Sequence, residues 1–486
     1  MTATSAPSEH QLRSFDKLFI GGTWVEPSSD EVIEVVSPID GAVVATVPAA
    51  QQADVDAAVA AARDAFDNGP WPRMSPAERA RYLARIGEEV VKRIPAMAAA
   101  FTREIGAPAP VSQAFHDNAR KMWNDSSTLH ERFVFEEERT WEGGRGRLVR
   151  EPVGVAAVII PWNGPVATAS LKIGPALAAG CTVVFKPAPE GPVSVMMLAE
   201  AIEAAGLPEG VVSVLPAGRE VGQYLVEHRD VDAVSFTGST AAGRRIMAAV
   251  ADRIGRVSLE LGGKSAAIIT DDVALENVLP TLVFAGVANS GQVCAALTRI
   301  LVPRSRQDEI TGALAEAYRG LVVGDPREEG TTIGPLAAKR QQERVLGYIR
   351  IGTEEGARLV TGGGVPEGLE DGCYVEPTIF ADVTPGMRIA QEEIFGPVVV
   401  VMPYDDVEQA VDIANSTEYG LSGAVYAADD ETAERIARRI RTGQIGVNTW
   451  DMCVTQPFGG YKQSGLGREG NVEGLGAFLE SKLIMR

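Results

Sequence analysis

From about residue 52 the apolar residues follow a helical pattern. In the first stretch these residues are Val55, Ala58, Val59, Ala62 and Phe66. Their steps of three and four residues place side chains on one face of a helix, and residues 77–91 repeat the spacing. Residues from about 52 to 105 are therefore predicted to be helical, with an apolar face packed against a core.

At Glu151 the pattern changes to short β-branched runs that alternate with Ala- and Leu-rich helical stretches. Gly or Pro marks each junction. The predicted strands are 153–160, 182–186, 211–215, 233–236 and 257–261. Alternating strands and helices predict βαβ units, in which helices cover both faces of a parallel sheet and ligands bind at the carboxyl ends of the strands.

A second round of the same alternation follows. Its predicted strands are 266–270, 299–302, 398–402, 423–426 and 445–448. The fold class predicted by the two rounds is α/β, with two doubly wound parallel-sheet lobes.

Residues 133–150 show a different alternation, of apolar and polar residues around Gly143 and Gly144. This pattern predicts a β-hairpin with a glycine turn that projects from the first lobe. Because a two-stranded ribbon is only marginally stable alone, we expect it to pair with another element or subunit.

The charge of the chain argues against several classes of partner. The 486 residues carry a formal net charge of −20, and no Lys/Arg-rich run interrupts it. Such a charge repels phosphate backbones, so nucleic acid is not expected as a partner. The longest apolar runs, such as 155–161, are strand-sized and shorter than the ~18–20 residues of a membrane span. The first 17 residues contain no apolar signal core, so a cytoplasmic location is expected.

Cysteine and histidine are scarce. Four widely spaced cysteines argue against a disulfide scaffold and against paired zinc-binding cysteines. With four histidines in the whole chain, no metal site is expected.

One cysteine, Cys294, lies among small and polar residues in the segment 289–295, NSGQVCA. The glycine and polar residues predict a loop after a helix over 279–288, where a thiol is partly exposed. Most lone cysteines are buried small hydrophobes. From the local residues alone, Cys294 is therefore either a core residue or a nucleophile.

Glu260 stands in an apolar strand-like run, within the segment 258–265, SLELGGKS. The Gly-Lys-Ser of this segment resembles a phosphate loop, but Ser258 occupies the position where that motif needs Gly. A carboxylate at such a strand end either has a structural partner or is desolvated, which would raise its pKa and let it act as a general base. Both interpretations stay open here.

Two further strand ends carry candidate binding groups. The segment 236–243, FTGSTAAG, predicts a strand, a glycine turn and a helix start, which either binds an anionic group or is an ordinary Ser/Thr-capped helix. The dinucleotide fingerprint GxGxxG is absent from it. Asn163, in PWNGP at 161–165, is either a turn residue or the donor to an oxyanion.

Taken together, these motifs resemble the NAD(P)-dependent aldehyde dehydrogenase superfamily, over nearly the whole chain from residue 15. They occur in the family's order, as PWNGP at 161–165, Lys186 at a strand end, FTGST at 236–240, LELGGKS at 259–265, GQVC at 291–294, EEIFGPV at 392–398 and PFGGYKQSGLGRE at 457–469. Seven motifs in one order are very hard to explain by chance.

The resemblance implies a catalytic set. Cys294 would attack the aldehyde carbon, and the Asn163 amide with the Cys294 backbone N–H would hold the oxyanion. After hydride transfer to the nicotinamide, Glu260 would activate the water that hydrolyses the thioester, and it would also help to activate the thiol. Relatives that pass the acyl group to coenzyme A typically lack this Glu, so its presence favours hydrolysis.

The resemblance also implies a cofactor site for NAD. The implied cofactor-binding residues are Ile159, Pro161, Trp162, Lys186, Gly218, Phe236, Gly238, Ser239, Leu261, Glu393 and Phe395. One position departs from the family, because Pro189 stands where NAD-preferring members commonly carry a ribose-binding Glu, and Glu190 follows it. NAD is therefore expected, with tolerance of NADP as a hypothesis.

The implied aldehyde tunnel is lined by residues flanking Asn163 and Cys294. They are Gly164, Val166, Thr168, Leu171, Val293, Ala295, Trp450 and Phe458. Leu171 stands where members that oxidise acidic semialdehydes often place Arg, so an apolar wall and a hydrophobic aldehyde (aromatic, terpenoid or medium-chain aliphatic) are expected. Gly164 and Thr168 replace bulkier residues and predict a roomy tunnel.

Other functions stay open as alternatives. One is the oxidation of a semialdehyde or of betaine aldehyde, although Trp450 alone is a poor cage for a cation. A second is a cysteine acyltransferase or thioesterase without redox chemistry. A third is a non-catalytic binding protein, which would have no reason to keep Cys294, Glu260 and Asn163 together.

The resemblance finally implies how the chain is divided. Residues 1–126 and 149–263 would form a Rossmann-like cofactor-binding domain, 264–463 a catalytic domain, and 127–148 with 464–486 an oligomerisation element. A homodimer or homotetramer is expected. Lys172 and Glu469 match a proton route away from the site, and a structural ion pair is the alternative for them.

Overall fold

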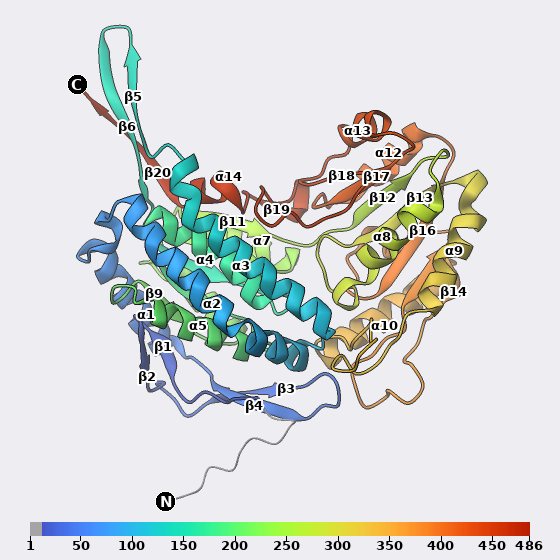
Figure 1. The fold of residues 1–486 in the computed structure, drawn as a ribbon, viewed down its shortest axis with the longest axis horizontal. Coiled ribbons are helices and arrows are strands. Elements are labelled where there is room, and N and C mark those ends of the chain that lie inside the picture. Colours follow the sequence, from blue (N-terminus) through green and yellow to red (C-terminus); the bar gives the residue numbers. More distant parts are fainter. Residues whose placement is uncertain (1–11) are drawn as a thin grey trace, which may run out of the picture.

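The chain folds into two α/β lobes that stand side by side, with a β-ribbon projecting from the first (Figure 1). The structure is a computed structural model and describes residues 12–486. The first 17 residues, which contain no apolar signal core, lie partly outside this range. No helix between residues 12 and 486 is long and apolar enough to cross a membrane.

The first lobe is built on an eight-stranded sheet with the order β19-β11-β10-β7-β8-β9-β1-β2. Its strands are β1 (Leu18–Ile20), β2 (Thr23–Val25), β7 (Val155–Ile159), β8 (Thr182–Lys186), β9 (Val212–Val214), β10 (Ala233–Thr237), β11 (Arg256–Glu260) and β19 (Gly465–Leu466). The five central strands, β7 to β11, are parallel. They confirm the predicted strands, and the sheet is doubly wound.

Helices cover both faces of this sheet. They are α1 (Gln52–Asp67), α2 (Pro76–Ile105), α3 (Ala109–Arg132), α4 (Pro165–Ala179), α5 (Val193–Ala205), α6 (Arg219–Glu227), α7 (Thr240–Ala251) and α14 (Asn471–Gly476). On β7, Ala156 and Val158 pack against the core of α2, α4 and α5, whereas Val155 and Ala157 pack against α1, α6 and α7. Burial of alternate residues on both faces explains why the strand reads as an unbroken apolar run.

The second lobe has a seven-stranded sheet with the order β14-β15-β16-β13-β12-β17-β18. Its strands are β12 (Ser265–Ile269), β13 (Leu297–Pro303), β14 (Arg358–Thr361), β15 (Thr378–Ala381), β16 (Val398–Tyr404), β17 (Gly423–Tyr426) and β18 (Gly446–Val447). Its helices are α8 (Leu275–Val287), α9 (Gln307–Arg319), α10 (Lys339–Glu354), α11 (Arg388–Gln391), α12 (Val407–Asn415) and α13 (Asp430–Ala437). The strand predicted over 445–448 stops early because Asn448 is left-handed, with a φ of 54°.

The predicted hairpin is present as β5 (Glu136–Trp141) and β6 (Gly144–Pro152), and Gly143 turns it with a φ of 84°. The C-terminal strand β20 (Leu479–Met485) pairs with β6 and completes a three-stranded sheet. The ribbon thus finds its partner within the chain. A separate two-stranded sheet, β3 (Val32–Val36) with β4 (Val43–Pro48), lies before α1.

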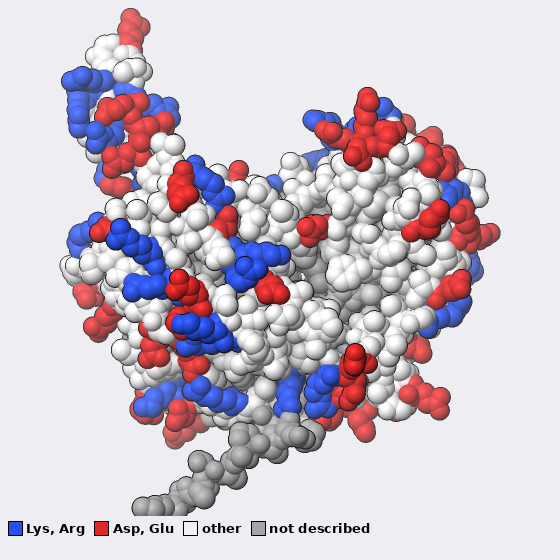
Figure 2. Space-filling model, in the orientation of Figure 1, with Lys and Arg blue, Asp and Glu red and all other residues white. Residues whose placement is uncertain are grey.

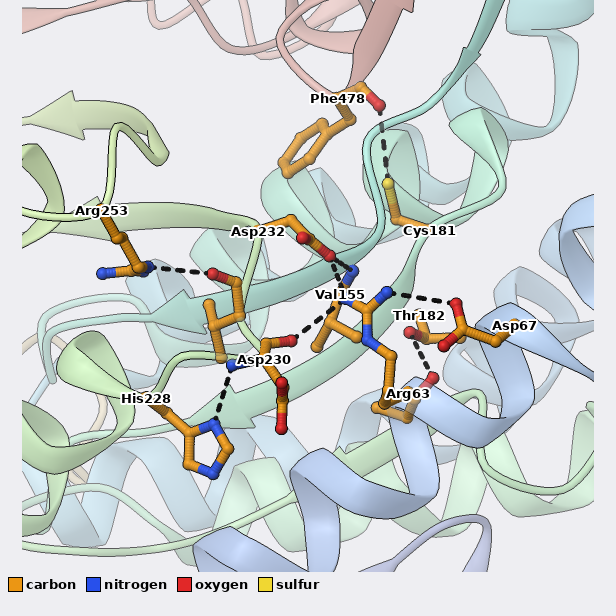
Figure 3. Close-up of polar contacts among 12 residues, drawn as sticks. Arg63, Asp67, Val155, Cys181, Thr182, His228, Asp230, Asp232, Arg253 and Phe478 are labelled. Carbon is orange, nitrogen blue, oxygen red and sulfur yellow. Dashed lines mark hydrogen bonds and ion pairs between the residues drawn. The ribbon is translucent and has the colours of Figure 1, made fainter.

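A polar cluster at the amino ends of β7, β8 and β10 ties remote segments to the first sheet (Figure 3). The Asp232 carboxylate accepts the backbone N–H of Val155 at 2.8 Å and forms an ion pair with Arg63 of α1. Cys181 donates to the carbonyl of Phe478 at 3.5 Å, which fixes the C-terminal segment to β8. This cluster lies at the edge opposite to the one where ligands bind in such sheets.

Candidate active site

A cavity of about 300 Å³ lies between the two lobes, at the carboxyl ends of β7, β10 and β11. The predicted residues that line it are Pro161, Trp162, Asn163, Gly164, Thr168, Leu171, Gly238, Ser239, Glu260, Leu261, Val293, Cys294, Glu393, Phe395, Phe458 and Glu469. The structure thus brings the three predicted catalytic side chains together, Asn163 and Glu260 from the first lobe and Cys294 from the second.

The remaining predicted residues lie outside the cavity wall. They are Ile159, Val166, Lys172, Lys186, Gly218, Phe236, Ala295 and Trp450. Val166 is buried in the core of the first lobe, and Ala295 with Trp450 belongs to a small apolar cluster that also contains Val293 of the wall. Their predicted roles stay predictions.

Cys294 is presented by a loop with unusual backbone geometry. After α8 ends, Asn289, Ser290 and Gly291 are all left-handed, with φ values of 51°, 55° and 73°. A Cβ at position 291 would lie 2.1 Å from the carbonyl oxygen of Gly396, so only glycine fits there. The Ser290 hydroxyl donates to the carbonyl of Gly334 at 2.8 Å and anchors the loop. This tight turn, rather than a helix, carries the sulfur into the cavity.

The Cys294 side chain is a protonated thiol at neutral pH. Burial raises its pKa to about 12, and the carboxylates of Glu393 and Glu260 act in the same direction. The backbone N–H groups of Ala295 and Cys294 oppose this shift. A thiolate at neutral pH therefore needs a base that takes the proton as the reaction begins.

Glu260 is suited to be that base. It is the last residue of β11 and only 2% exposed, and neither carboxylate oxygen has a hydrogen-bond partner among the residues that the structure describes. Burial raises its pKa, and the neighbouring Glu469 adds to the rise. A carboxylate that is desolvated and free of hydrogen bonds accepts a proton readily near neutral pH.

Behind Glu260 lies a buried ion pair between Lys172 of α4 and Glu469. The Lys172 ammonium also donates to the Ser235 hydroxyl at 3.1 Å. Glu469 lines the cavity, whereas Lys172 does not. The pair thus connects the wall of the cavity with the interior of the first lobe, which suits either a proton route or a structural role.

The Asn163 amide is oriented toward the nucleophile loop. Its Nδ2 donates to the carbonyl of Gln292 at 2.9 Å, two residues before Cys294. The backbone carbonyl of Asn163 accepts from the Asn289 side-chain amide at 3.0 Å. Because an amide nitrogen carries two hydrogens, the second remains available to another acceptor in the cavity.

One end of the cavity has the chemistry of a dinucleotide site. Gly238 and Ser239 lead into α7, whose first turn favours an anionic phosphate, and Ser239 caps this helix by accepting the N–H of Ala242 at 3.3 Å. The Glu393 carboxylate accepts the N–H of Gly263 at 3.0 Å. A Cβ at position 262 would lie 2.7 Å from the same carboxylate, so glycine permits the close approach.

The predicted ribose-binding lysine lies further along the same sheet edge. Lys186 ends β8 and is buried, and burial lowers its pKa to about 8 while Glu190 opposes the shift. Its ammonium donates to the carbonyl of Pro187 at 2.9 Å. Glu190, beyond Pro189, forms an ion pair with Arg340 of α10 and so links the two lobes.

The tunnel wall contains residues that the sequence patterns did not reveal. They are Phe115, Asn118 and Met122 of α3, with Met452, Cys453 and Val454 of the late loop. At Gly164, where room was expected, a Cβ would lie 2.9 Å from the Phe115 ring. The aromatic ring therefore occupies the space that glycine leaves. No motif marks α3 as part of the wall, since its place there depends on how the helices pack.

The wall is short of positive charge. Within the described residues, the only basic side chain lining the cavity is Arg344, and it donates to the carbonyl oxygens of Glu393 and Ile394 at the dinucleotide end. Leu171 faces the cavity from α4. No group of His, Cys, Asp or Glu side chains between residues 12 and 486 is arranged to hold a metal ion.

The sequence matches the model of the Aldehyde dehydrogenase family over residues 24–484. Among curated relatives, geranial dehydrogenase of Castellaniella defragrans is 42% identical, with 96% of this chain and 98% of the relative covered. A 3-succinoylsemialdehyde-pyridine dehydrogenase of Pseudomonas sp. is also 42% identical, with 98% and 99% covered.

Solved structures show the same likeness. The chain is 48% identical to a Mycobacterium tuberculosis aldehyde dehydrogenase complexed with NAD+, with a TM-score of 0.96 over 97% of this chain and 98% of that one. It is 42% identical to a Pseudomonas syringae aldehyde dehydrogenase mutant complexed with NAD+ and octanal, with a TM-score of 0.93 over 99% and 98%.

Proposed function

Since the chain belongs to the aldehyde dehydrogenase family, a family of oxidoreductases, we propose that it oxidises a hydrophobic aldehyde to the carboxylic acid with NAD. One observation carries the mechanism. Cys294, Glu260 and Asn163, which come from three separate segments, line one cavity together with the dinucleotide-type groups Gly238 and Ser239.

In the first half of the reaction the Cys294 thiol loses its proton to Glu260, either directly or through a water. The sulfur forms a bond to the aldehyde carbon, and the carbonyl oxygen becomes an oxyanion held by the Asn163 amide and the Cys294 backbone N–H. A bound nicotinamide dinucleotide supplies the acceptor for the hydride lost in oxidation. The acyl group is then a thioester on Cys294.

In the second half Glu260, after it has passed on the proton taken from the thiol, acts as general base toward water. It removes a proton while the water oxygen bonds to the thioester carbon, and the carbon–sulfur bond breaks to release the acid and the thiol. Burial raises the pKa of Glu260, which makes its carboxylate a stronger base. Glu469 and Lys172 provide the next groups along which that proton can leave.

NAD is the proposed cofactor because the NAD+ complexes of the relatives match this chain over nearly its whole length. Pro189 removes the carboxylate that commonly binds the ribose hydroxyls. Glu190 is nevertheless close enough to affect the pKa of Lys186. Its negative charge disfavours the phosphate of NADP, so NAD is expected to be preferred and NADP to be used more slowly.

The proposed substrate is hydrophobic because the tunnel residues Leu171, Val293 and Phe458 are apolar. Burying an unpaired carboxylate costs several kcal/mol, which disfavours small acidic semialdehydes. The names of relatives point both ways, toward geranial and octanal but also toward a pyridine-bearing semialdehyde. Within the described residues, no basic side chain lies in the part of the wall formed by Leu171, Val293 and Phe458, which favours a hydrophobic aldehyde.

The domain division and the assembly of subunits are also proposals. Residues 1–126 with 149–263 form the proposed cofactor-binding domain, and 264–463 the proposed catalytic domain. Residues 127–148 with 464–486 are proposed to assemble copies of the chain into a dimer or tetramer, since β5, β6 and β20 form one projecting sheet.

The mechanism is tested by two substitutions and their controls. Cys294→Ala should abolish aldehyde oxidation while cofactor binding survives. Glu260→Gln should lower steady-state turnover by about 10²–10⁴, the typical contribution of a general base. The NADH burst should still reach up to one equivalent but should form more slowly, because Glu260 also takes the thiol proton. Stopped-flow absorbance measures both phases.

The controls are Cys373→Ala and Glu316→Gln, which remove a thiol and a carboxylate outside the cavity and should leave turnover unchanged. A burst as fast in Glu260→Gln as in the unmodified protein would mean that Glu260 does not take the thiol proton. Turnover of activated esters without any NAD-dependent oxidation would instead support the acyltransferase alternative.

The substrate class is tested with octanal, benzaldehyde and succinic semialdehyde, each assayed with NAD and NADP. The value of kcat/KM should be at least about tenfold higher for a hydrophobic aldehyde, because 1.4 kcal/mol already separates rates by that factor. Leu171→Arg should narrow or reverse this difference in kcat/KM, because the arginine would pair with the carboxylate of succinic semialdehyde. Leu171→Met should leave the difference unchanged. Faster turnover of succinic semialdehyde by the unmodified enzyme would contradict the proposal.

A further inference from the structure

A second, much smaller cavity lies in the second lobe beside the turn between β11 and β12. Its wall includes Lys264, Ser265, Arg299, Tyr419 and Thr442, and it shares no residue with the active-site cavity. Its volume of about 10 Å³ is close to the smallest that holds one water-sized ligand. Any occupant is therefore an atom or a very small molecule, and phosphate or a carboxylate ligand is too large.

Three polar side-chain atoms in this wall are buried and have no hydrogen-bond partner within residues 12–486. They are Nζ of Lys264, Oγ of Ser265 and Oγ1 of Thr442, and the Lys264 side chain is only 2% exposed. Buried ammonium and hydroxyl groups are nearly always hydrogen-bonded in folded proteins. All three atoms are donors, so together they fit an acceptor.

The wall also carries positive charge, and no Asp or Glu among the described residues lines it. The buried Arg299 guanidinium donates to the backbone carbonyls of Lys264, Ile413 and Ala414 at 2.7–2.8 Å. A neutral acceptor such as water would satisfy the hydrogen bonds of the wall but would leave this charge uncompensated.

The acids nearest to Lys264 are already engaged elsewhere. Glu393 accepts the N–H of Gly263, and Glu392 is bonded to Arg388 and Tyr348. Both raise the pKa of Lys264, yet burial and the charge of Arg299 lower it to about 7. A small anion beside the ammonium would favour its charged form and supply the missing acceptor.

We infer that this cavity binds a single halide ion, chloride under ordinary conditions, between Lys264, Arg299 and Thr442. Because the ion would bind the folded chain only, it raises the free energy of unfolding as its concentration rises. It also holds the turn from which the Gly263 amide donates to Glu393.

Crystals grown with bromide in place of chloride test the site directly. An anomalous peak within hydrogen-bond distance of Nζ of Lys264 is expected in the unmodified protein. Bromide peaks confined to the protein surface, or a feature at Lys264 that scatters as water, would overturn the inference. This measurement does not depend on whether any variant folds.

Solution measurements add a matched comparison. The thermal midpoint of unfolding should rise from sodium gluconate to sodium chloride at constant ionic strength, which separates specific binding from screening. Lys264→Met should lose this chloride-dependent rise. Lys92→Met, the same change at an exposed lysine of α2, should keep it. An equal rise in both variants would mean that chloride acts elsewhere.

Discussion

At the scale of single residues, the site is governed by what surrounds a few buried ionisable groups. Cys294 and Glu260 are both pushed toward their protonated forms by burial, and each is further affected by a second carboxylate. Two acids and one thiol in a small apolar space cannot all be charged together. The protonation of each of these groups therefore depends on the charge of the others.

The reactivity of Cys294 should respond to the charge of Glu393. Among charged neighbours Glu393 contributes most to the raised pKa of Cys294, so Glu393→Gln should lower this pKa. Below the pKa, each unit of decrease gives a tenfold larger thiolate fraction, and carboxamidomethylation at pH 8 should accelerate several-fold. Peptide mass spectrometry measures the rate at Cys294, with the exposed Cys453 as internal reference.

Glu392→Gln serves as the matched control for this prediction. Glu392 is next to Glu393 in the chain but pairs with Arg388 instead, so its removal should leave the alkylation rate of Cys294 unchanged. Equal rates in all three proteins would show that Glu393 is uncharged in the free enzyme.

At the scale of elements, α5 begins with a cap that comes from another helix. Glu104, the penultimate residue of α2, is fully buried, and its carboxylate accepts the N–H groups of Val193 and Ser194. Burial raises the pKa of Glu104 to about 8 despite these two hydrogen bonds. The native state therefore binds a proton at this site over a pH range in which the unfolded chain has lost it.

This linkage predicts how stability depends on pH. The contribution of Glu104 is complete below the unfolded pKa of about 4.3, and it is lost as the pH rises through the folded pKa of about 8. Glu104→Gln cannot titrate, so the thermal midpoint of this variant should fall less steeply between pH 5 and 8 than that of the unmodified protein. Glu88→Gln, at an exposed site of α2, should keep the original slope.

Identical slopes in Glu104→Gln and the unmodified protein would contradict the raised pKa. The prediction concerns the difference between two slopes, so other groups that titrate in both proteins cancel. Differential scanning fluorimetry over a buffer series is sufficient to measure it.

The elements also show which parts of the fold the sequence could predict. Strands buried on both faces, such as β8, read as continuous β-branched runs and were found. The strands β1, β2 and β19 could not be predicted from the sequence, because two or three residues are too few to show an alternating pattern. The same limit applies to the site, since Glu260 and Cys294 lie in local motifs whereas Phe115 reaches the wall only through the packing of α3.

At the scale of the whole molecule, the two lobes build the site jointly. The turn between β11 and β12 passes directly from Glu260 in one sheet to Ser265 in the other. The ion pair of Glu190 with Arg340 joins the lobes a second time. Acidic side chains gather over α13 at the outer end of the second lobe, while both signs of charge alternate along the ribbon (Figure 2). On this face, the ribbon therefore both projects from the first lobe and carries acidic and basic side chains together.

One face of the ribbon carries an apolar stripe suited to a second copy of the chain. Trp141, Leu148, Leu483 and Met485 lie on the same face by the register of the strands, and Trp141 packs over Gly144. Leu483 and Met485 are 43% and 72% exposed. An exposed apolar stripe on a projecting sheet marks an interaction surface.

The proposed assembly through this stripe can be tested by changing it without unpairing the sheet. Leu483→Glu combined with Met485→Glu places two buried charges in the interface, so sedimentation velocity should show a shift from the assembled species to the monomer. Ile484→Glu changes a residue of the opposite face, 44% exposed, and should shift the equilibrium less. If both variants dissociate equally, copies join through the strand edges instead, and if neither dissociates, another surface holds them together.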